Sequence, residues 1–284
     1  MNAVNRKTSY KFRSIWISDI HLGTRGCQAE MLLDFLKHTE SKYLYLVGDI
    51  IDGWRMRRAW YWRQAHNDVI QKILRKACKG TRVVYVPGNH DENFRDFSNH
   101  RFGRVAVLNE AYHTMADGRR FLVIHGDQFD GVVKYAKWLA FLGDNAYNAA
   151  LMLNLWLNIV RRKLGFSYWS LSAYLKHKVK NAVVSSYEAA VVGEARKLGV
   201  QGVICGHIHT AEMRDMDGIL YCNDGDWVES CTALVEHEDG RLEILKWAEL
   251  RGLSFLKDED ACDSSSSPMP GFPKSMVSSE PSTR

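Results

Sequence analysis

Short apolar runs alternate with amphipathic stretches along most of the chain. The apolar runs are rich in β-branched and aromatic residues, a pattern typical of buried strands, and they occupy residues 14–18, 43–47, 82–86, 121–124 and 202–205. Apolar residues recur at helical spacing over 29–39 and 59–79. This alternation predicts an α/β fold with a mixed sheet, or with two sheets packed face to face, and with helices on the outside.

Turn signals add antiparallel strand pairs to this picture. The dipeptide Asp-Gly favours two-residue hairpin turns, and it occurs at 117–118 and 217–218. A further turn at 238–240 joins two expected strands, 232–236 and 241–247. We therefore expect hairpins in the second half of the chain.

Residues 130–198 break the alternation, because they contain several helical patterns and no convincing strand. Between Lys134 and Tyr187 there are eight Lys or Arg residues and one acidic residue, Asp144. We predict a helical insertion with two open interpretations. It forms a lid over an anionic amphiphile, since Trp and Tyr suit a membrane interface and cations suit phosphates, or it is a basic helical hairpin that completes the core.

The two ends differ from the rest of the chain. Residues 1–12 are predicted to be a flexible basic tail. Residues 257–284 contain four of the five prolines and a run of serines, so we predict that they are disordered. One domain, 13–256, is expected between these tails.

Composition excludes several classes of protein. With 46% hydrophobic and 25% charged residues, the 284-residue chain is neither intrinsically disordered over most of its length nor collagen-like or coiled-coil. The net charge of +5 suits an anionic substrate, but it does not by itself indicate nucleic-acid binding.

The cysteines and the N-terminal residues indicate a cytoplasmic protein with reduced thiols. None of the six cysteines forms a C-x-x-C pair, which argues against a zinc ribbon or redox motif. Residues 1–13 are polar and lack a secretory signal. The most apolar stretch, 146–160, is interrupted by asparagines, so we expect no membrane span, whereas binding to a membrane surface stays open.

Five predicted strands each end in a short polar motif. In order, the motifs are D-I-H at 19–21, G-D at 48–49, G-N-H-D at 88–91, H-G-D at 125–127 and G-H-I-H at 206–209. Ligand sites in α/β proteins lie at the carboxyl ends of strands, so we expect these loops to converge. The glycines in the motifs permit sharp turns and close backbone approach.

The motifs supply seven candidate metal ligands, all oxygen or imidazole: Asp19, His21, Asp49, Asn89, His125, His207 and His209. Seven ligands exceed what one ion needs but suit two, and a carboxylate such as Asp49 can bridge a pair. The absence of thiolates favours Mn, Fe, Zn or Co. Two such ions can activate a water and hold both ends of an in-line displacement at phosphorus.

The ordered series D-x-H, G-D, G-N-H-D, H-G-D and G-H-x-H resembles the calcineurin-like binuclear metallophosphoesterase superfamily. The resemblance implies a four-layer α-β-β-α sandwich with the helical insertion as a lid, and two divalent metal ions, of which Mn²⁺ is expected. It implies a first metal held by Asp19, His21, Asp49 and His209, and a second held by Asp49, Asn89, His125 and His207. A bridging hydroxide would attack phosphorus, and His90 would stabilise or protonate the leaving oxygen, with its imidazole oriented by Asp91.

Three further features are similar to the branch that contains the UDP-2,3-diacylglucosamine diphosphatases of lipid A synthesis. They are D-x-H-L at 19–22, G-D-x-x-D-x-W at 48–54 and the insertion at 130–198. This resemblance, over about 14–247, implies hydrolysis of a lipid-linked nucleotide sugar to UMP and a lipid sugar phosphate at the cytoplasmic face of the inner membrane. The substrate contacts that we expect are Asp130, Lys176, Lys180 and Asn181. Nucleic acid is not the expected partner.

One departure keeps other substrates open. Members of this branch often carry Arg where this chain has His90. A histidine can protonate an alkoxide-like leaving group, so a phosphodiesterase or nuclease is the second hypothesis. A non-catalytic scaffold is the third, although a scaffold is expected to have lost ligands and here every ligand position is filled.

Several other residues have plainer interpretations. A single strand-end histidine is often only hydrogen-bonded, and Asp52 and Asp127 are expected to support turns or neighbouring ligands. Packing roles are expected for the tryptophans Trp54, Trp60 and Trp62. Histidines outside the motifs are interpreted as surface or core residues: His66, His100 and His113.

Overall fold

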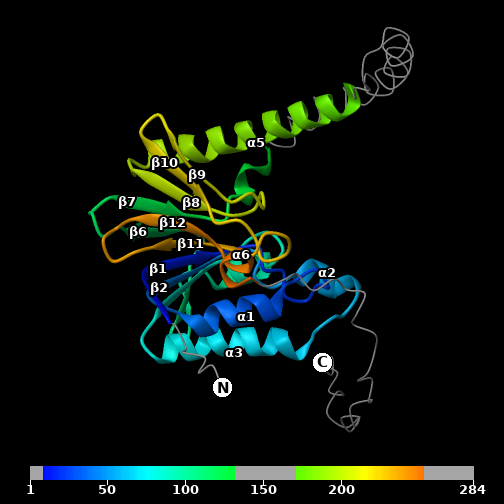
Figure 1. Ribbon diagram of the computed structural model, residues 1–284, viewed down its shortest axis with the longest axis vertical. Coiled ribbons are helices and arrows are strands. Elements are labelled where there is room, and N and C mark those ends of the chain that lie inside the picture. The colour runs from blue at the N-terminus through cyan, green and yellow to red at the C-terminus, as the bar shows by residue number, and fades with distance from the viewer. Residues whose placement is uncertain (1–8, 132–170, 253–284) are drawn as a thin grey trace, which may run out of the picture.

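The computed structural model describes residues 9–131 and 171–252, with side chains described for 9–131 and 184–252. Two sheets lie face to face between layers of helices (Figure 1). The first sheet has seven strands in the order β12-β11-β1-β2-β3-β5-β4. Their bounds are β1 Tyr10–Ile17, β2 Thr39–Val47, β3 Arg82–Val86, β4 Arg101–Phe102, β5 Val105–Val107, β11 Thr232–Glu236 and β12 Leu242–Lys246.

The second sheet has five strands in the order β6-β7-β8-β10-β9. These are β6 Ala111–Thr114, β7 Arg120–Val123, β8 Gly202–Cys205, β9 Glu212–Met216 and β10 Ile219–Asn223. The turns at 117–118 and 217–218 join antiparallel pairs, β6 with β7 and β9 with β10, as predicted. Strands β1, β2 and β3 are parallel, and so are β7 and β8, so within each group the carboxyl ends lie at one edge.

Helices cover the outer face of each sheet. The helical elements are α1 Ala29–His38, α2 Gly53–Arg58, α3 Gln64–Cys78, α5 Leu171–Lys197 and α6 Trp247–Arg251, with 3₁₀ turns η1 Glu92–Phe97 and η2 Asp127–Phe129. Helix α1 buries Leu32, Phe35 and Leu36 against the first sheet, at the spacing expected of one helix face. The C-terminal part of α5 buries Tyr187 and Val191 against the second sheet.

The core follows these layers. One apolar cluster lies between α1, α3 and the first sheet, one between α5 and the second sheet, and one between the sheets, where Trp16 and Phe121 are fully buried. The predicted four-layer α-β-β-α sandwich is confirmed. The helical insertion stays a prediction, because residues 132–170 lie outside the described ranges, as does the predicted C-terminal tail. Strand β1 begins at Tyr10, inside the range expected to be a tail.

The helix expected over 59–79 is wrong at its start. Residues Gly53–Arg58 form α2, whose first turn is capped by the Asp52 carboxylate, which accepts a hydrogen bond from Arg55 N at 2.8 Å. Ala59 then has an extended backbone (φ −150°, ψ 117°), and α3 begins only at Gln64. The extended residue ends the first helix, and the apolar periodicity does not reveal this break.

A buried polar cluster joins the two sheets within the third apolar layer. The Glu236 carboxylate of β11 accepts hydrogen bonds from Arg13 and Ser14 of β1, and it lies 2.9 Å from Nε2 of His113 on β6. Tyr45 of β2 places its hydroxyl 2.9 Å from His113 Nδ1. His113 is therefore a core residue with partners in both sheets, in agreement with its plain interpretation.

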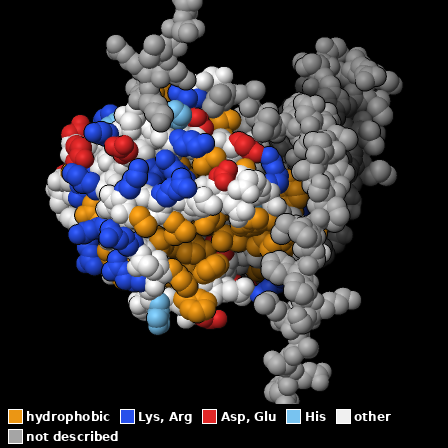
Figure 2. Space-filling view, turned by 90° about the horizontal axis from the view of Figure 1, so that it is seen from below, with side chains coloured by type: hydrophobic (Ala, Val, Ile, Leu, Met, Phe, Trp, Pro, Cys, Tyr) orange, Lys and Arg blue, Asp and Glu red, His pale blue; other side chains and the backbone are white. Residues whose placement is uncertain are grey.

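The surface and the thiols complete the picture. The face seen from below carries a continuous apolar area beside groups of Lys and Arg (Figure 2). None of the helices in the described ranges combines the length and apolarity that crossing a lipid bilayer requires. The five cysteines among the described residues are free thiols, as predicted.

Candidate metal centre

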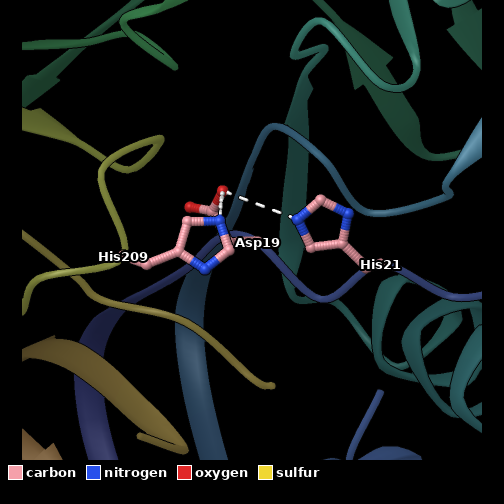
Figure 3. A group of neighbouring side chains, drawn as sticks. All are labelled: Asp19, His21 and His209. Carbon is pink, nitrogen blue, oxygen red and sulfur yellow. Dashed lines mark ion pairs between the residues drawn. The ribbon is translucent and has the colours of Figure 1, made fainter. Parts of the chain in front are cut away.

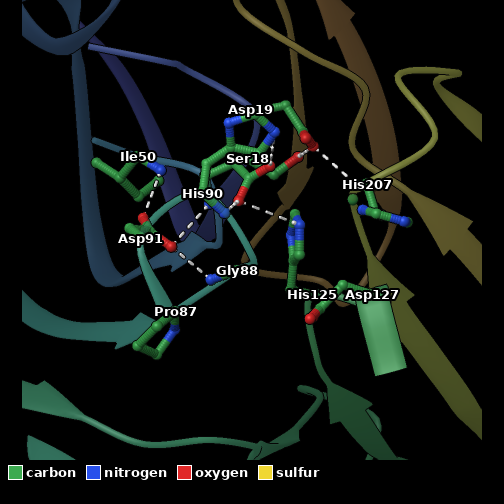
Figure 4. A network of polar contacts seen from close by, with 12 residues as sticks. Ser18, Asp19, Ile50, Pro87, Gly88, His90, Asp91, His125, Asp127 and His207 are labelled. Carbon is green, nitrogen blue, oxygen red and sulfur yellow. Dashed lines mark hydrogen bonds and ion pairs between the residues drawn. The ribbon is translucent and has the colours of Figure 1, made fainter. Parts of the chain in front are cut away.

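The loops that follow β1, β2, β3, β7 and β8 meet between the two sheets, so the expected convergence of the five motifs is observed (Figure 4). The carboxylates and imidazoles form three overlapping groups whose ligand atoms lie within 4.8 Å of one another. The groups are Asp19 with His21 and His209, His21 with Asp49 and His90, and Asp19 with Asp49 and His125.

The first group comes from the two sheets (Figure 3). Asp19 Oδ1 lies 3.2 Å from His209 Nε2 and 4.0 Å from His21 Nε2. The other oxygen, Oδ2, is held by the backbone N–H of His207 at 2.8 Å and by the Ser18 hydroxyl at 2.6 Å. Only Oδ1 therefore faces the two imidazoles, as a ligand oxygen would.

Asp49 lies between the groups. Its Oδ2 is 3.9 Å from His21 Nε2, and its Oδ1 is 3.5 Å from His125 Nε2. The two oxygens of one carboxylate therefore face two different imidazoles, which is the arrangement that a bridging carboxylate needs.

Hydrogen bonds fix the orientation of two imidazoles. His125 Nδ1 lies 2.9 Å from the carbonyl of Val47, so this nitrogen carries the proton and donates it. In the neutral ring Nε2 then presents a lone pair toward the Asp49 carboxylate, a repulsive pairing unless a cation lies between them. Burial opposes a charge on His125, but the Asp49 and Asp19 carboxylates raise its pKa to about 10, which shows how strongly this place favours positive charge.

Buried atoms without partners give an independent test of whether these residues fit metal ions. Among the described residues, Asp19 Oδ1, Asn89 Oδ1 and His125 Nε2 are buried and accept or donate no hydrogen bond. Buried polar atoms are almost always paired, and those that are not require an explanation. Two of these atoms, Asp19 Oδ1 and His125 Nε2, belong to residues grouped with Asp49, and oxygen and imidazole donors of this kind are the ones that hard or borderline divalent cations prefer. The residues present therefore fit a metal centre.

His207 lies beside this centre, but its side chain has another partner. Its ring centroid is 5.1 Å from that of His125, and its Nε2 is 2.7 Å from the carboxylate of Asp130. Asp130, expected to contact substrate, instead pairs with an expected ligand. The described positions thus place His207 beside His125 of the group formed by Asp19, Asp49 and His125, without including His207 in any of the three groups.

Backbone strain is concentrated in the motifs. Five of the seven candidate ligands have positive φ angles between 48° and 71°: Asp19, His21, Asp49, His207 and His209. This region is uncommon for residues with a side chain and costs about 1–2 kcal/mol per residue. The surrounding structure holds the strain at the place where the side chains must converge, a pattern found at functional sites.

Two glycines make room for the ligands. A Cβ atom added to Gly88 would lie 2.2 Å from Asp49 Oδ1, and one added to Gly48 would lie 2.1 Å from His125 Nδ1. Gly48 also has a φ of +83°. The close approach predicted for the motif glycines is therefore observed at both positions.

The structure corrects the expected partner of His90. Asp91 does not orient this imidazole, because its carboxylate accepts hydrogen bonds from the backbone of Gly88 and Ile50 and from the Tyr85 hydroxyl. Asp52 takes that place: its Oδ2 lies 3.0 Å from His90 Nδ1, although the alignment falls short of a hydrogen bond. Asp91 instead holds the turn between β3 and η1 against the loop after β2.

Asp52 also lies 3.0 Å from His21 Nδ1. Burial opposes ionisation of Asp52, but the hydrogen bond with His21, the close His90 ring and the backbone N–H of Arg55 hold its pKa well below the usual range. The predicted supporting role of Asp52 is confirmed. Asp127, the other carboxylate expected to play such a part, makes two hydrogen bonds with Arg95, of 2.7 and 2.8 Å.

The expected substrate contacts on α5 and the expected packing tryptophans differ in outcome. The side chains of Lys176, Lys180 and Asn181 lie outside those that the structure describes, although their backbone belongs to α5. The packing role expected of Trp60 is wrong, because this side chain is 77% exposed. Trp54 is 42% exposed and lies with its ring centroid 4.6 Å from that of His90, beside the centre.

Sequence reasoning missed a buried partner of Asp19. Ser18 Oγ lies 2.6 Å from both Asp19 Oδ2 and Asp224 Oδ1. Burial raises the pKa of Asp224 well above its usual range, and the Ser18 hydroxyl lies between this carboxyl group and Asp19. The signal was present, since the polar run 223–226 directly follows a buried strand, as the five recognised motifs do.

Comparison with known proteins adds three observations. A sequence profile described as calcineurin-like phosphoesterase matches residues 12–211. A UDP-2,3-diacylglucosamine hydrolase of Haemophilus influenzae is 24% identical over 262 residues, which cover 86% of this chain and 99% of that protein. A DNA polymerase II small subunit of Pyrococcus abyssi is 25% identical over 160 residues, or 45% of this chain, but the match spans only 26% of that subunit.

A solved structure of a Vps29 variant from Entamoeba histolytica is also similar to this chain. It has a TM-score of 0.40 and 13% sequence identity, and the match covers 82% of this chain and 96% of the other.

Proposed function

The chain belongs to the calcineurin-like phosphoesterase family, and from this membership we propose that it hydrolyses the pyrophosphate bond of UDP-2,3-diacylglucosamine to UMP and a diacylglucosamine 1-phosphate. The membership makes the protein a metal-dependent phosphohydrolase. The finer proposal is supported by the relative of Haemophilus influenzae, which bears the name of this activity and aligns over 99% of its length.

The observation that carries the metal-dependent hydrolysis is the set of buried ligand atoms without hydrogen-bond partners, of which Asp19 Oδ1 and His125 Nε2 belong to residues grouped with Asp49. We assign Asp19, His21, Asp49 and His209 to one ion, and Asp49, Asn89, His125 and His207 to the other, with Mn²⁺ as the expected metal. In this assignment the His207 imidazole leaves the Asp130 carboxylate and binds the ion instead. When bound, a pair of divalent cations lowers the pKa of a water and neutralises charge at phosphorus.

The protein's own side chains act on the leaving group, and His90 is the one placed to do so. His90 is partly exposed beside the centre, and the carboxylates of Asp52 and Asp49 raise its pKa despite partial burial. The raised pKa favours the protonated ring, which can donate a proton to, or hold it near, the leaving oxygen. Asp52 fixes the His21 and His90 rings together, because one oxygen contacts both Nδ1 atoms.

The proposed substrate places the protein on a membrane surface. We propose that it works in the cytoplasm, on the cytoplasmic face of the inner membrane, with the basic insertion at 130–198 as a lid that carries Lys176, Lys180 and Asn181 toward the lipid. Asp130 lies at the start of that segment, next to His207.

A phosphodiesterase or nuclease is the second candidate, and one observation favours it. His90 can protonate an alkoxide, which a pyrophosphate does not require because its leaving group is already a stable phosphate. The archaeal polymerase subunit also matches this chain, although over a minor part of its length.

The test is a direct comparison of substrates with protein reconstituted in Mn²⁺. Release of UMP from UDP-2,3-diacylglucosamine, without cleavage of single-stranded DNA by the same protein preparation, supports the first candidate. Cleavage of DNA alone contradicts it and supports the second.

Asp49→Asn should lose both ions and all activity, because both assigned sites share this carboxylate. Metal analysis of the purified protein and the same substrate assay measure the two losses. Asp215→Asn, an exposed change on β9, serves as the matched control and should keep both.

A further inference from the structure

A cleft of about 590 Å³ opens directly beside the metal centre. Its inner wall contains His21, His90 and His209, and its outer wall contains three arginines, Arg25, Arg55 and Arg58, with Tyr61. A cavity of this size holds considerably more than one phosphate group. The cleft therefore extends the site away from the reacting phosphorus toward a cationic wall.

The positive charge of this wall is not neutralised by neighbouring side chains. Asp52 is the one carboxylate that lines the cleft, and its oxygens are already used by His21 and by the start of α2. Among the described residues, no ion pair involves the guanidinium groups of Arg25, Arg55 or Arg58. Three guanidinium groups thus face a cavity without a counter-ion from the described part of the chain.

The arginines come from two segments that are packed together. Arg25 lies on the loop between β1 and α1, whereas Arg55 and Arg58 lie on α2. Gly23, with a φ of +100°, is so close to Met56 of α2 that an added Cβ would lie 2.6 Å from Met56 Cγ. The loop and the helix are therefore packed against each other, and this contact holds Arg25 beside the helix that carries Arg55 and Arg58.

Aromatic contact positions one of these groups. The guanidinium of Arg25 lies over the Tyr61 ring, 5.0 Å from its centroid, a cation–π contact that holds the group at the cleft without using its N–H donors on a carboxylate. Guanidinium groups match the oxygens of phosphate, with which they form paired hydrogen bonds. We propose that this arginine cleft, formed by Arg25, Arg55 and Arg58, binds a second phosphate group of the substrate, next to the phosphate that reacts.

This inference rests on the proposed phosphohydrolase function and narrows its substrate class to compounds with two neighbouring phosphate groups. A simple phosphodiester would leave the arginines without an anion. A pyrophosphate would place one phosphate at the metals and the other among the guanidinium groups, where their positive charge also stabilises the departing phosphate.

The test measures binding of UDP and UMP to the Mn²⁺-loaded protein by isothermal titration calorimetry, with Mn²⁺ in excess. We expect UDP to bind at least tenfold more tightly than UMP. Arg25→Gln and Arg58→Gln should each reduce the UDP-to-UMP ratio of binding affinities several-fold. The double variant should bring this ratio close to one. Arg57→Gln is the matched control, because Arg57 lies on the same helix, donates to Asn93 and does not line the cleft.

The outcomes separate the two proposals. A UDP-to-UMP ratio that is unchanged in the double variant overturns the arginine cleft, even if the lipid substrate is hydrolysed. A ratio that falls as expected supports the cleft even if UDP-2,3-diacylglucosamine is not a substrate, in which case only the identity of the pyrophosphate compound is wrong. A ratio that falls equally in Arg57→Gln also overturns the proposal, since it indicates a general effect of surface charge.

Discussion

Asp52 is the residue that links the metal centre to both the leaving-group side and the arginine cleft. Its carboxylate contacts His21 and His90 and caps the helix that carries Arg55 and Arg58. A single ionised side chain therefore positions a proposed ligand, a proposed proton donor and a cationic wall. Its low pKa keeps this carboxylate ionised throughout the physiological range.

The role of His90 can be tested at the level of one side chain. His90→Gln should retain both ions and reduce kcat by about 10²–10⁴-fold, the usual contribution of a general acid. Metal analysis and steady-state kinetics on the same preparation measure the two effects. His100→Gln, an exposed histidine outside the centre, is the control. Loss of an ion from His90→Gln would make His90 a ligand, which its position within 4.8 Å of His21 and Asp49 ligand atoms permits.

At this scale the sequence reveals a residue when its partners are near it in the chain. The candidate ligands could be identified because each belongs to a compact motif at a strand end. The partnership of Ser18 with Asp224 was not predictable in the same way, because it depends on contact between segments about 200 residues apart. The wrong partner predicted for His90 has a similar cause. Asp91 was expected because it is adjacent to His90 in the sequence, but the turn directs its carboxylate toward backbone amides and Asp52 lies beside the ring instead.

The turn after β3 shows how an element positions the centre. Gly88 brings the backbone against Asp49, while Asp91 ties the same turn to the loop after β2 through Ile50. Sequence predicted the strand and the need for glycine, because both are local properties. It did not predict α2, which the Asp52 cap begins, and it started the next helix at residue 59, where the extended Ala59 ends α2 and α3 begins only at Gln64.

Gly88→Ala should therefore disable the centre without unfolding the protein. Because the new Cβ would lie 2.2 Å from Asp49 Oδ1, the carboxylate must move, and we expect at least a tenfold loss in Mn²⁺ affinity. Calorimetric titration with Mn²⁺ measures the change, and circular dichroism checks that the fold persists. Gly193→Ala, at a position in α5 where no atom lies within 4 Å of the added Cβ, controls for a glycine substitution outside the site. Equal affinities in wild type and Gly88→Ala would exclude the close approach as a requirement.

The whole molecule is a sandwich whose two sheets share polar groups as well as an apolar layer. Glu236, Arg13 and Ser14 belong to the first sheet and His113 to the second. The layer order followed from the alternation of strands and helices, since each apolar face must be covered. The pairing of Glu236 with His113 did not, because neither residue belongs to a motif and they are separated by more than 120 positions.

This buried cluster predicts a dependence of stability on pH. Burial disfavours the charge of Glu236, but hydrogen bonds from His113, Ser14 and Arg13 lower its pKa from 4.5 to about 2. The stabilisation is therefore complete above pH 4.5 and is lost as the pH falls from 4.5 toward 2, with an upper value of about 3 kcal/mol.

Glu236→Gln should lower the free energy of unfolding at pH 7, and the difference from wild type should narrow as the pH falls below 4.5. Urea denaturation between pH 7 and pH 3.5 measures both. Glu238→Gln removes an exposed carboxylate that pairs with Lys42 and should change stability by less than about 1 kcal/mol at every pH. A deficit in Glu236→Gln that is constant across this range would show that charge on Glu236 contributes nothing.

The positions of the two polar clusters have a consequence for how the sandwich comes apart. Arg13 and Ser14 lie in the middle of β1, whereas Asp19 follows its end, so the Glu236 cluster and the proposed ion pair join the two sheets at two different places along this strand. We expect acid to weaken the first connection and a chelator to weaken the second. A metal-free molecule would then keep its sheets joined at the Glu236 cluster, while the Asp19 and Asp49 carboxylates repel each other at the end of the strand.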